Sequence, residues 1–293
     1  MFIANNWHDY EVLDCGGGEK LERWGDVYLR RPDPQAIWPA RDPSLWRKAQ
    51  AHYHRSEKGG GSWEFFDKLP ERWEINYGCN GDNLKFYVRP TGFKHTGLFP
   101  EQAANWDWMN ALVKQRRAEG RDVRVLNLFA YTGGATMACA AAGAQVCHCD
   151  AAKGMVQWAR ENRELSRLPE ESTRWIVDDA LKFVQREARR GHFYDGILMD
   201  PPSYGRSDNS VWKIEDDLYP LVEESVKILS DNPVFFLINS YTTGLQPAVL
   251  NNMLRMTVQK KFGGSIKAEE VVLPVTEGGV LPCGASGRWS ALE

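Results

Sequence analysis

The sequence predicts an α/β protein in which a mainly parallel sheet with connecting helices follows a smaller β-rich domain. Three observations support this fold class. Residues 1–98 alternate short β-like runs with turns and show almost no helical periodicity. Residues 123–150 then supply a strand, a glycine turn, a helix, a second strand and a terminal acid in succession. Beyond residue 150, helical and strand patterns continue to alternate, which is the rhythm of a parallel sheet.

The first region is rich in tryptophan. We expect residues 1–98 to form an N-terminal β-rich domain with a candidate role in substrate recognition, and residues 99–293 to form the second domain. Aromatic side chains interleaved with arginines can stack on unpaired bases, or they can fill the core of a small β domain. Because basic and acidic residues balance in this region, we favour core positions for most of its tryptophans, which stand at positions 7, 24, 38, 46, 63 and 73.

A connecting segment, Phe93 to Gln102, lies between the two regions, and a helix is expected from Ala103 to about Glu119. The segment immediately precedes the strand that leads into the glycine turn. We therefore expect it to act as a hinge that folds over a bound ligand.

The glycine turn follows a short apolar run, Val123 to Phe129, which is typical of a strand buried on both faces of a parallel sheet. Gly133 and Gly134 then permit positive φ and a close approach of ligand to backbone, and a small-residue helix follows over residues 135–142. Asp150 comes 17 residues after Gly133. Nucleotide-binding βαβ units place a carboxylate against ribose hydroxyls at an offset of about 20 residues.

The turn lacks the third glycine of the dinucleotide fingerprint, so a pyrophosphate site is disfavoured. A cofactor that has a ribose but no phosphates needs only the turn and the acid. S-adenosylmethionine (AdoMet) fits that description, and S-adenosylhomocysteine would then be the product. The alternative is an ordinary strand-to-helix turn without a ligand.

Acidic residues recur at the ends of the next two expected strands. Asp178 and Asp179 follow the strand at residues 174–177, and Asp200 follows the strand at residues 194–199. In an open parallel sheet, ligands bind at the carboxyl ends of the strands. Asp179 is thus suitably placed to accept a hydrogen bond from an adenine amino group.

The run Asp200-Pro201-Pro202-Ser203-Tyr204 is the second informative motif. Two prolines stiffen the backbone and remove N–H donors, so that carbonyl oxygens project beside a carboxylate. Such a loop can accept the hydrogens of an exocyclic amine while Tyr204 or Trp212 stacks on a flat ring. The alternative is a rigid turn in which Asp200 caps a helix.

Composition limits the partners and the compartment. The chain has 293 residues, 43% of them hydrophobic and 26% charged. It has no basic segment followed by an apolar core near its start and no apolar stretch of about 18 residues, so we expect a cytoplasmic protein without membrane contact. Because the net charge is −3, the chain as a whole does not attract RNA, and an RNA partner would have to bind to local basic patches.

No metal site is expected. The six cysteines are scattered and should be reduced thiols. On a strand, Cys147 and Cys149 face one side and His148 the other, so the three cannot readily converge on one ion. His52 and His54 form a second pair without a further ligand cluster nearby in the sequence, and we expect a surface pair.

Four motifs together carry a family resemblance: HTGLFPEQ, LNLFAYTGGATMACAAAGAQVCHCD, VDDALKF and FYDGILMDPPSYGR. The chain resembles the class I AdoMet-dependent methyltransferases, particularly the bacterial large-subunit ribosomal RNA methyltransferase family that includes cytosine-5 and guanine-7 enzymes. The likeness covers about residues 84–241. It implies a Rossmann-like seven-stranded sheet with a reversed final strand, and residues 233–240, 266–273 and 288–292 can supply the last three strands.

The resemblance also implies site residues. Asp150 would contact the ribose and Asp179 the adenine. The residues expected to bind the cofactor are Phe99, Gln102, Phe129, Ala130, Tyr131, Thr132, Gly133, Asp150, Ala151, Asp179, Ala180 and Asp200. The residues expected at the transfer site are Asp200, Pro201, Pro202, Ser203 and Tyr204.

The sequence departs from the family pattern at two places, and these limit which reaction the resemblance implies. The cytosine-5 members attack the base through a cysteine after the fifth strand, whereas this chain has Asn239-Ser240-Tyr241 there and Ser203 in the proline loop. A hydroxyl without an adjacent base is a far weaker nucleophile than a thiolate, so carbon-5 chemistry is disfavoured. Ala103 also stands where the family often has arginine. We therefore expect direct in-line methyl transfer to a nitrogen, with a base in ribosomal RNA as the favoured acceptor.

Three alternatives stay open at this point. The chain could methylate a small molecule or a protein side chain, or it could be a non-catalytic RNA-binding protein with an AdoMet fold. An NAD-dependent oxidoreductase is disfavoured most. We also expect a mobile loop over residues 207–217, a flexible linker over residues 58–62, and a hairpin rather than a phosphate contact at residues 281–288. The oligomeric state is left open.

Overall fold

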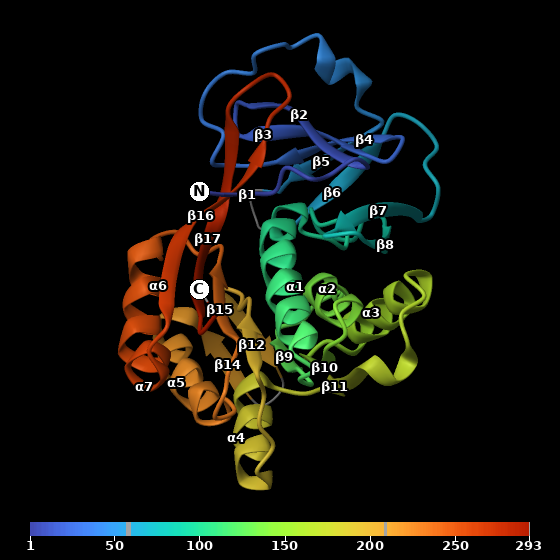
Figure 1. Cartoon of the computed structure of the whole chain (residues 1–293). Coiled ribbons are helices and arrows are strands. Elements are labelled where there is room, and N and C mark those ends of the chain that lie inside the picture. Colours follow the sequence, from blue (N-terminus) through green and yellow to red (C-terminus); the bar gives the residue numbers. More distant parts are fainter. Residues whose placement is uncertain (57–59, 208–209, 293) are drawn as a thin grey trace. The chain divides into compact units, whose positions relative to one another are not determined.

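The computed structural model of the chain describes residues 1–56, 60–207 and 210–292, and its elements are labelled in Figure 1. The chain divides into two compact units. The N-terminal unit contains residues 2–104 and 271–283, and the C-terminal unit contains residues 105–270 and 284–293 together with Met1. Residues 271–283 thus belong to the N-terminal unit. The expected division of the chain into residues 1–98 and 99–293 did not include this return of the chain.

The N-terminal unit is built on a five-stranded sheet. Strands β4 and β5 pair in parallel, and the other neighbours pair antiparallel. A separate hairpin joins β7 (Trp73–Cys79) to β8 (Asp82–Val88), and β1 (Phe2–Ile3) pairs with residues 271–272. Short 3-10 helices, η1 (Leu45–Lys48) and η2 (Pro100–Gln102), lie in the connections. In order across the sheet, the strands are β2 (Tyr10–Gly16), β3 (Glu19–Trp24), β4 (Val27–Pro32), β5 (Ala51–Arg55) and β6 (Gly61–Phe65).

The expectation that most of these tryptophans lie in the core is wrong. Of the six in this unit, Trp24 is completely buried, while the other five are half-buried. Each half-buried indole donates its N–H to a protein oxygen, as Trp38 does to the Cys15 carbonyl at 3.0 Å and Trp73 to the Trp24 carbonyl at 2.8 Å. The polar edge of an indole needs a partner when it is buried, which holds these rings at the margin of a small core.

A mixed sheet with the strand order β1-β16-β17-β15-β12-β9-β10-β11 belongs mainly to the C-terminal unit, while β1 and the parts of β16 and β17 within residues 271–283 belong to the N-terminal unit. The five strands from β15 to β11 are parallel, and β17 runs antiparallel to β15, which confirms the expected reversed final strand. The short strand β1 adds an eighth strand, beside β16, to the seven that were expected. The strands are β9 (Arg124–Leu128), β10 (Gln145–Asp150), β11 (Thr173–Val177), β12 (Gly196–Met199), β15 (Phe235–Ser240), β16 (Ser265–Pro274) and β17 (Val280–Ser290).

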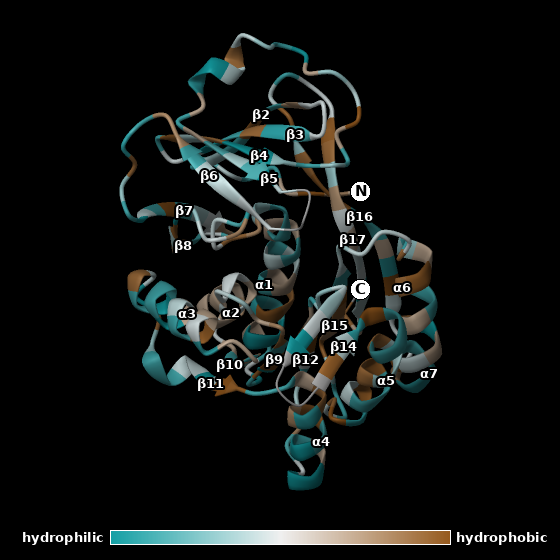
Figure 2. Ribbon diagram, turned by 180° about the vertical axis from the view of Figure 1, so that it is seen from behind, coloured by the Kyte–Doolittle hydropathy of each residue, from teal (hydrophilic) through white to brown (hydrophobic). Residues whose placement is uncertain are grey.

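Helices connect these strands, and their apolar faces supply the core. Leu126, Phe183, Leu218 and Phe236 belong to one buried cluster that joins the sheet to α4 and α5. The C-terminal end of α4, which includes Arg189 and Arg190, is hydrophilic (Figure 2). No described helix has the length and hydrophobicity needed to cross a bilayer. The helices are α1 (Ala103–Ala118), α2 (Gly134–Ala141), α3 (Lys153–Leu165), η3 (Glu170–Ser172), α4 (Ala180–Arg190), α5 (Ile214–Lys227), α6 (Pro247–Leu254), η4 (Arg255–Gln259) and α7 (Lys260–Phe262).

The expected hairpin at residues 281–288 is wrong, because these residues lie inside β17 and the turn precedes them at residues 276–279. Two glycines had suggested a turn, but both serve close packing. A Cβ atom at Gly284 would lie 2.7 Å from the Ser240 carbonyl oxygen, and one at Gly287 would lie 2.9 Å from the Leu250 Cβ. Glycine inside a strand often marks such an approach.

Two expected loops fall partly outside the described residues. Of the mobile loop expected at residues 207–217, residues 208–209 lie outside the description, while their neighbours form the paired strands β13 (Tyr204–Ser207) and β14 (Ser210–Lys213). Of the expected linker, residues 58–59 lie outside the description, and β6 begins at Gly61.

Candidate cofactor site and transfer loop

The loop between β9 and α2 has an unusual backbone. Phe129, Tyr131 and Gly133 have φ values of 55°, 52° and 87°. Positive φ is strained for residues with side chains, and such strain gathers at ligand sites. The loop leaves β9 beside β12, where the strand order of the sheet reverses, and ligands bind at such a point in open α/β sheets.

Asp150 ties the end of β10 to this loop. Its Oδ2 accepts the Tyr131 N–H and its Oδ1 accepts the Ala152 N–H, both at 2.8 Å. Burial raises the pKa of Asp150, and the two backbone hydrogen bonds oppose that effect. Each carboxylate oxygen can accept a second hydrogen bond, so the group can bind vicinal hydroxyls while it stays fixed.

The expected cofactor fits these residues in two respects. A strained loop beside a fixed carboxylate suits the ribose of AdoMet, and Gly133 takes a left-handed conformation that glycine adopts without strain. Thr132 of the loop is buried, and its carbonyl accepts a hydrogen bond from the Asn162 side chain at 2.9 Å. The loop is therefore held in place by the protein, which preorganises it for a ligand.

We expect Asp150→Ala to weaken AdoMet binding by about 1.5 to 3 kcal/mol, because charge-assisted hydrogen bonds to the ribose and the anchor of the Tyr131 N–H are both lost. Titration calorimetry on the full chain measures the change. Glu161→Ala, which removes an acidic residue from α3, serves as the control. An unchanged affinity in Asp150→Ala would remove this carboxylate from the site.

The two acids after β11 have structural partners. Asp179 is the N-cap of α4 and accepts the Lys182 N–H at 3.0 Å, while Asp178 binds Arg186 at 2.5 Å. Ala180 is the first, buried residue of the helix, and Ala151 is exposed just after β10. The adenine contact expected for Asp179 stays a prediction. Its Oδ1 already accepts the Lys182 N–H that caps the helix.

The transfer loop, residues 200–204, is fixed at several points. Asp200 Oδ1 accepts the side-chain N–H of Asn239 at 2.7 Å, and the Ser203 and Thr242 hydroxyls are 2.6 Å apart. The Pro202 carbonyl accepts the indole N–H of Trp212 at 2.7 Å. Sequence reasoning assigned the loop carbonyls to a substrate amine, but the structure uses the Pro202 carbonyl within the protein.

The two aromatic residues proposed to stack on a substrate ring lie in different surroundings. The ring of Trp212 lies 5.0 Å from that of Phe129, between centroids, so it packs against the cofactor loop. Tyr204 is 58% exposed, and it is the side chain of the transfer loop that a flat ring could reach. Pro201 is buried at the end of β12.

Sequence reasoning missed a chain of hydrogen bonds behind Asp200, which we call the Asp200 relay and which links Arg288, Asn105, Ser286, Asn239 and Asp200. Arg288 Nε donates to Asn105 Oδ1 at 2.9 Å, and Asn105 Nδ2 donates to Ser286 Oγ at 2.9 Å. Ser286 Oγ then donates to Asn239 Oδ1 at 2.6 Å, and Asn239 donates to Asp200. The four residues behind the carboxylate are all buried.

The relay has only one consistent direction. A guanidinium can only donate, and an ionised carboxylate can only accept. Each amide between these ends must therefore turn its oxygen toward Arg288 and its nitrogen toward Asp200. The relay therefore fixes the rotamer of Asp200 through the hydrogen bond from Asn239.

Phe99 and Gln102 belong to the N-terminal unit. The Phe99 ring lies 5.2 Å from that of His95, and Gln102 ends η2. Burial lowers the pKa of His95 to about 4, with the charges of Arg31 and Lys94 acting in the same direction. The cofactor role expected for Phe99 and Gln102 stays a prediction.

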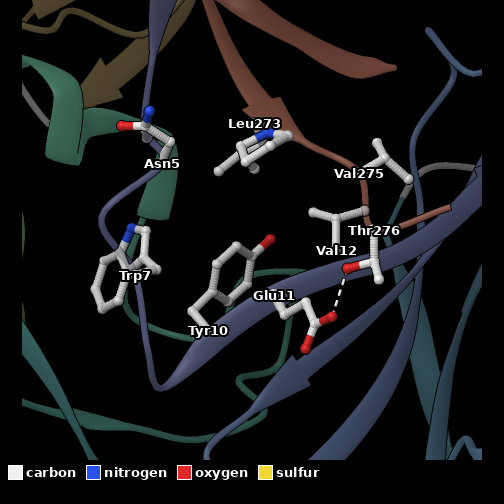
Figure 3. Close-up of a pocket in the computed structure, with 10 residues that line it drawn as sticks. Asn5, Trp7, Tyr10, Glu11, Val12, Leu273, Val275 and Thr276 are labelled. Carbon is white, nitrogen blue, oxygen red and sulfur yellow. Dashed lines mark hydrogen bonds between the residues drawn. The ribbon is translucent and has the colours of Figure 1, made fainter. Parts of the chain in front are cut away.

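The N-terminal unit has a pocket of about 160 Å³ (Figure 3). Trp7 and Tyr10 lie on one side of it and Leu273 on another, and Glu11 accepts a hydrogen bond from Thr276 at its rim. None of the site residues expected from the sequence lines this pocket.

Comparisons with known proteins agree with this geometry. A family model described as S-adenosylmethionine-dependent methyltransferase matches residues 37–224. A crystal structure of the SAM-dependent methyltransferase from Agrobacterium tumefaciens superposes with a TM-score of 0.91 at 35% identity, covering 98% of this chain and 92% of that one.

Two curated relatives are similar over most of the chain. Ribosomal RNA large subunit methyltransferase K from Neisseria meningitidis is 31% identical over 230 residues, which is 75% of this chain and 62% of the relative. Ribosomal RNA large subunit methyltransferase K/L from Syntrophotalea carbinolica is 30% identical over 190 residues, 64% of this chain and 25% of the relative. The chain thus matches less than two thirds of the length of either relative.

Proposed function

Because the chain belongs to the S-adenosylmethionine-dependent methyltransferase family, as its resemblance to that family indicated, we propose that it transfers the methyl group of AdoMet directly to a nitrogen of a base in ribosomal RNA. The observation that carries the proposal is the orientation of Asp200 by Asn239 at the carboxyl end of β12. The names of the two curated relatives support RNA as the substrate.

The state of the cysteines supports nitrogen over carbon-5 as the acceptor. Covalent catalysis at carbon-5 needs a thiolate beside the base. Burial raises the pKa of Cys139 to about 12 and that of Cys147 to about 11, so both stay protonated at neutral pH. The end of β15 offers Asn239 and Ser240, which leaves acceptor orientation by Asp200 as the chemistry that this site supports.

In this mechanism AdoMet supplies an electrophilic methyl group, and the protein supplies orientation. Asp150 and the strained loop hold the cofactor, while Tyr204 stacks on the acceptor base. Asp200 accepts an N–H of the acceptor, which aims the nitrogen lone pair and favours the charge that develops on the nitrogen. A base in structured RNA must be unpaired or flipped to reach the loop.

The test is transfer of radiolabelled methyl from AdoMet to ribosomal RNA, free and in subunits, followed by mass spectrometry of the nucleosides. Label on a base nitrogen of guanosine or adenosine supports the proposal and names the base. Labelled 5-methylcytidine would overturn the nitrogen assignment. Label absent from RNA, with AdoMet still bound, would exclude these RNA substrates.

One observation favours a second candidate, methylation of a small molecule or a protein side chain. The net charge of −3 gives no overall attraction to a polyanion. Because the same loop could orient an amine of either kind, label in a protein or metabolite fraction of a cell extract would identify this activity.

We expect Asn239→Asp to make activity depend on pH in a way that wild type does not. At low pH the new carboxyl group keeps a proton and can donate it to Asp200, as the amide does. As pH rises, two carboxylates at hydrogen-bond distance must both ionise, and their repulsion turns Asp200 away. The ratio of variant to wild-type kcat should therefore fall with rising pH, by about tenfold or more.

The matched control is Asn252→Asp, which adds the same charge at an exposed position of α6. Its kcat should follow the wild-type pH profile. A kcat ratio for Asn239→Asp that stays constant with pH would show that the amide does not act through Asp200.

A further inference from the structure

Two histidines that looked like an isolated surface pair in the sequence have acidic neighbours in the structure. His52 and His54 are two residues apart on β5, so both project from the same face of the sheet. Glu64 on β6 is the direct cross-strand partner of His52. The nearest ligand atoms of these three residues all lie within 4.8 Å of one another. The expectation that the pair lacks a further ligand is therefore wrong.

A fourth residue, Glu19 on β3, contacts one of these histidines. Glu19 Oε1 lies 2.5 Å from His52 Nε2, and Glu64 Oε2 lies 2.7 Å from His54 Nε2. Each imidazole thus has its own carboxylate, and the two rings are 3.9 Å apart between centroids. Four strands of one sheet place an ordered row of charged and ligand-bearing groups on a single face, with Arg30 on β4 between Glu19 and His52.

We propose that His52, His54 and Glu64 bind a divalent transition-metal ion of the Zn²⁺ type, and that Glu19, which contacts His52, moves in as the fourth donor. Two imidazole nitrogens and two carboxylate oxygens form a ligand set that Zn²⁺ accepts in tetrahedral geometry. This site lies in the N-terminal unit and does not depend on the proposed methyl transfer.

The charges and the mobility of the ligands suit a cation. With neutral imidazoles, two carboxylates face one guanidinium, so the cluster carries a net negative charge. Tetrahedral Zn²⁺ bonds of about 2.0 to 2.2 Å require the ligand atoms to close to about 3.5 Å from one another. The side chains of His54 and Glu64 are 48% and 56% exposed and can move by that amount, whereas His52 is buried and provides a fixed anchor.

The tautomer of each neutral imidazole must change when the ion binds. Each Nε2 now lies beside a carboxylate and shares a hydrogen bond with it. A metal needs the Nε2 lone pair, so each neutral ring must carry its proton on Nδ1 instead. The carboxylates then exchange a hydrogen bond for a bond to the ion, which ties β3, β5 and β6 together.

The experiment is calorimetric titration of the full chain, stripped of metal with EDTA, with ZnCl₂. We expect one Zn²⁺ per chain with a Kd of about 1 μM or below, and an increase in Tm that EDTA reverses. His54→Ala and Glu64→Gln should each weaken Zn²⁺ binding by more than about tenfold. Both positions are exposed, so these variants should fold, and circular dichroism verifies that they do. MgCl₂ should produce no saturable binding.

His8→Ala is the matched control, because His8 is exposed and lies outside the cluster. It should bind Zn²⁺ as wild type does. Substitution with Co²⁺ reports the geometry, since a tetrahedral site absorbs visible light far more strongly than an octahedral one. Absence of saturable Zn²⁺ binding, or binding that survives in His54→Ala, would show that the cluster is only a pair of hydrogen-bonded His–Glu contacts.

Discussion

Replacing Asp200 with alanine is expected to reduce methyl transfer by about 10²-fold or more while AdoMet binding changes little. The carboxylate sits at the carboxyl end of β12, where the relay from Arg288 through Asn239 fixes its direction. Its loss leaves the acceptor nitrogen without the group that aims its lone pair, and small errors of alignment are costly in an in-line reaction. Single-turnover transfer to RNA and calorimetry with AdoMet measure the two quantities separately.

Asp216→Ala is the control for this variant, since it removes an exposed carboxylate from the start of nearby α5. It should keep both AdoMet binding and turnover. Normal turnover in Asp200→Ala would refute orientation by the transfer loop. Lost AdoMet binding in the same variant would instead place Asp200 in the cofactor site.

Replacing Glu22 with glutamine is expected to destabilise the N-terminal unit by about 3 to 5 kcal/mol. Glu22 is completely buried and binds Arg31 through both carboxylate oxygens, at 2.6 and 2.7 Å, while Tyr10 donates to it at 2.6 Å. Glutamine would remove the carboxylate that contacts the buried guanidinium of Arg31. Urea unfolding followed by circular dichroism and tryptophan fluorescence measures the free energy.

The same residue predicts a loss of stability in acid. Burial alone would raise the pKa of Glu22, but the charges of Arg31 and Lys20 outweigh it and lower the pKa from 4.5 to about 2. Because the folded pKa lies below the unfolded one, the contribution is complete above pH 4.5 and is lost as pH falls toward 2. Glu22→Gln should therefore show a smaller loss of stability across this window than wild type.

Glu11→Gln is the control, because Glu11 pairs with Arg23 in a partly exposed position. Such a pair contributes about 1 kcal/mol or less. If Glu22→Gln were no less stable than Glu11→Gln, the buried pair would contribute nothing beyond a surface contact.

The parts of the fold and site that the sequence predicted are those with local signals. The turn at Gly133 and the acid at Asp150 belong to one βαβ unit, and their contact through the Tyr131 N–H follows from that unit alone. The reversed final strand followed from the resemblance to a known family, and the antiparallel pairing of β17 with β15 confirms it.

The parts that the sequence did not predict depend on contacts between distant segments. Asn239 lies 39 residues from Asp200, and Asn105 lies 181 residues from Ser286. No periodicity links such positions, so the sequence marks Asn239 only as a departure from the cysteine of the cytosine-5 enzymes. Glu64 became a neighbour of His52 only through the register of β5 and β6.

The single direction of the Asp200 relay has a consequence for how its residues can vary. An acceptor in place of Arg288 would require Asn105 to turn its amide, and the reversal would pass through Ser286 and Asn239 to the carboxylate. Substitutions at these positions are therefore non-additive, and double-mutant cycles between the ends of the relay should yield coupling energies of about 0.5 to 3 kcal/mol. A substitution of Arg288 on β17 should therefore be tolerated only together with compensating substitutions at Asn105 on α1 and at Asn239, which contacts the transfer loop.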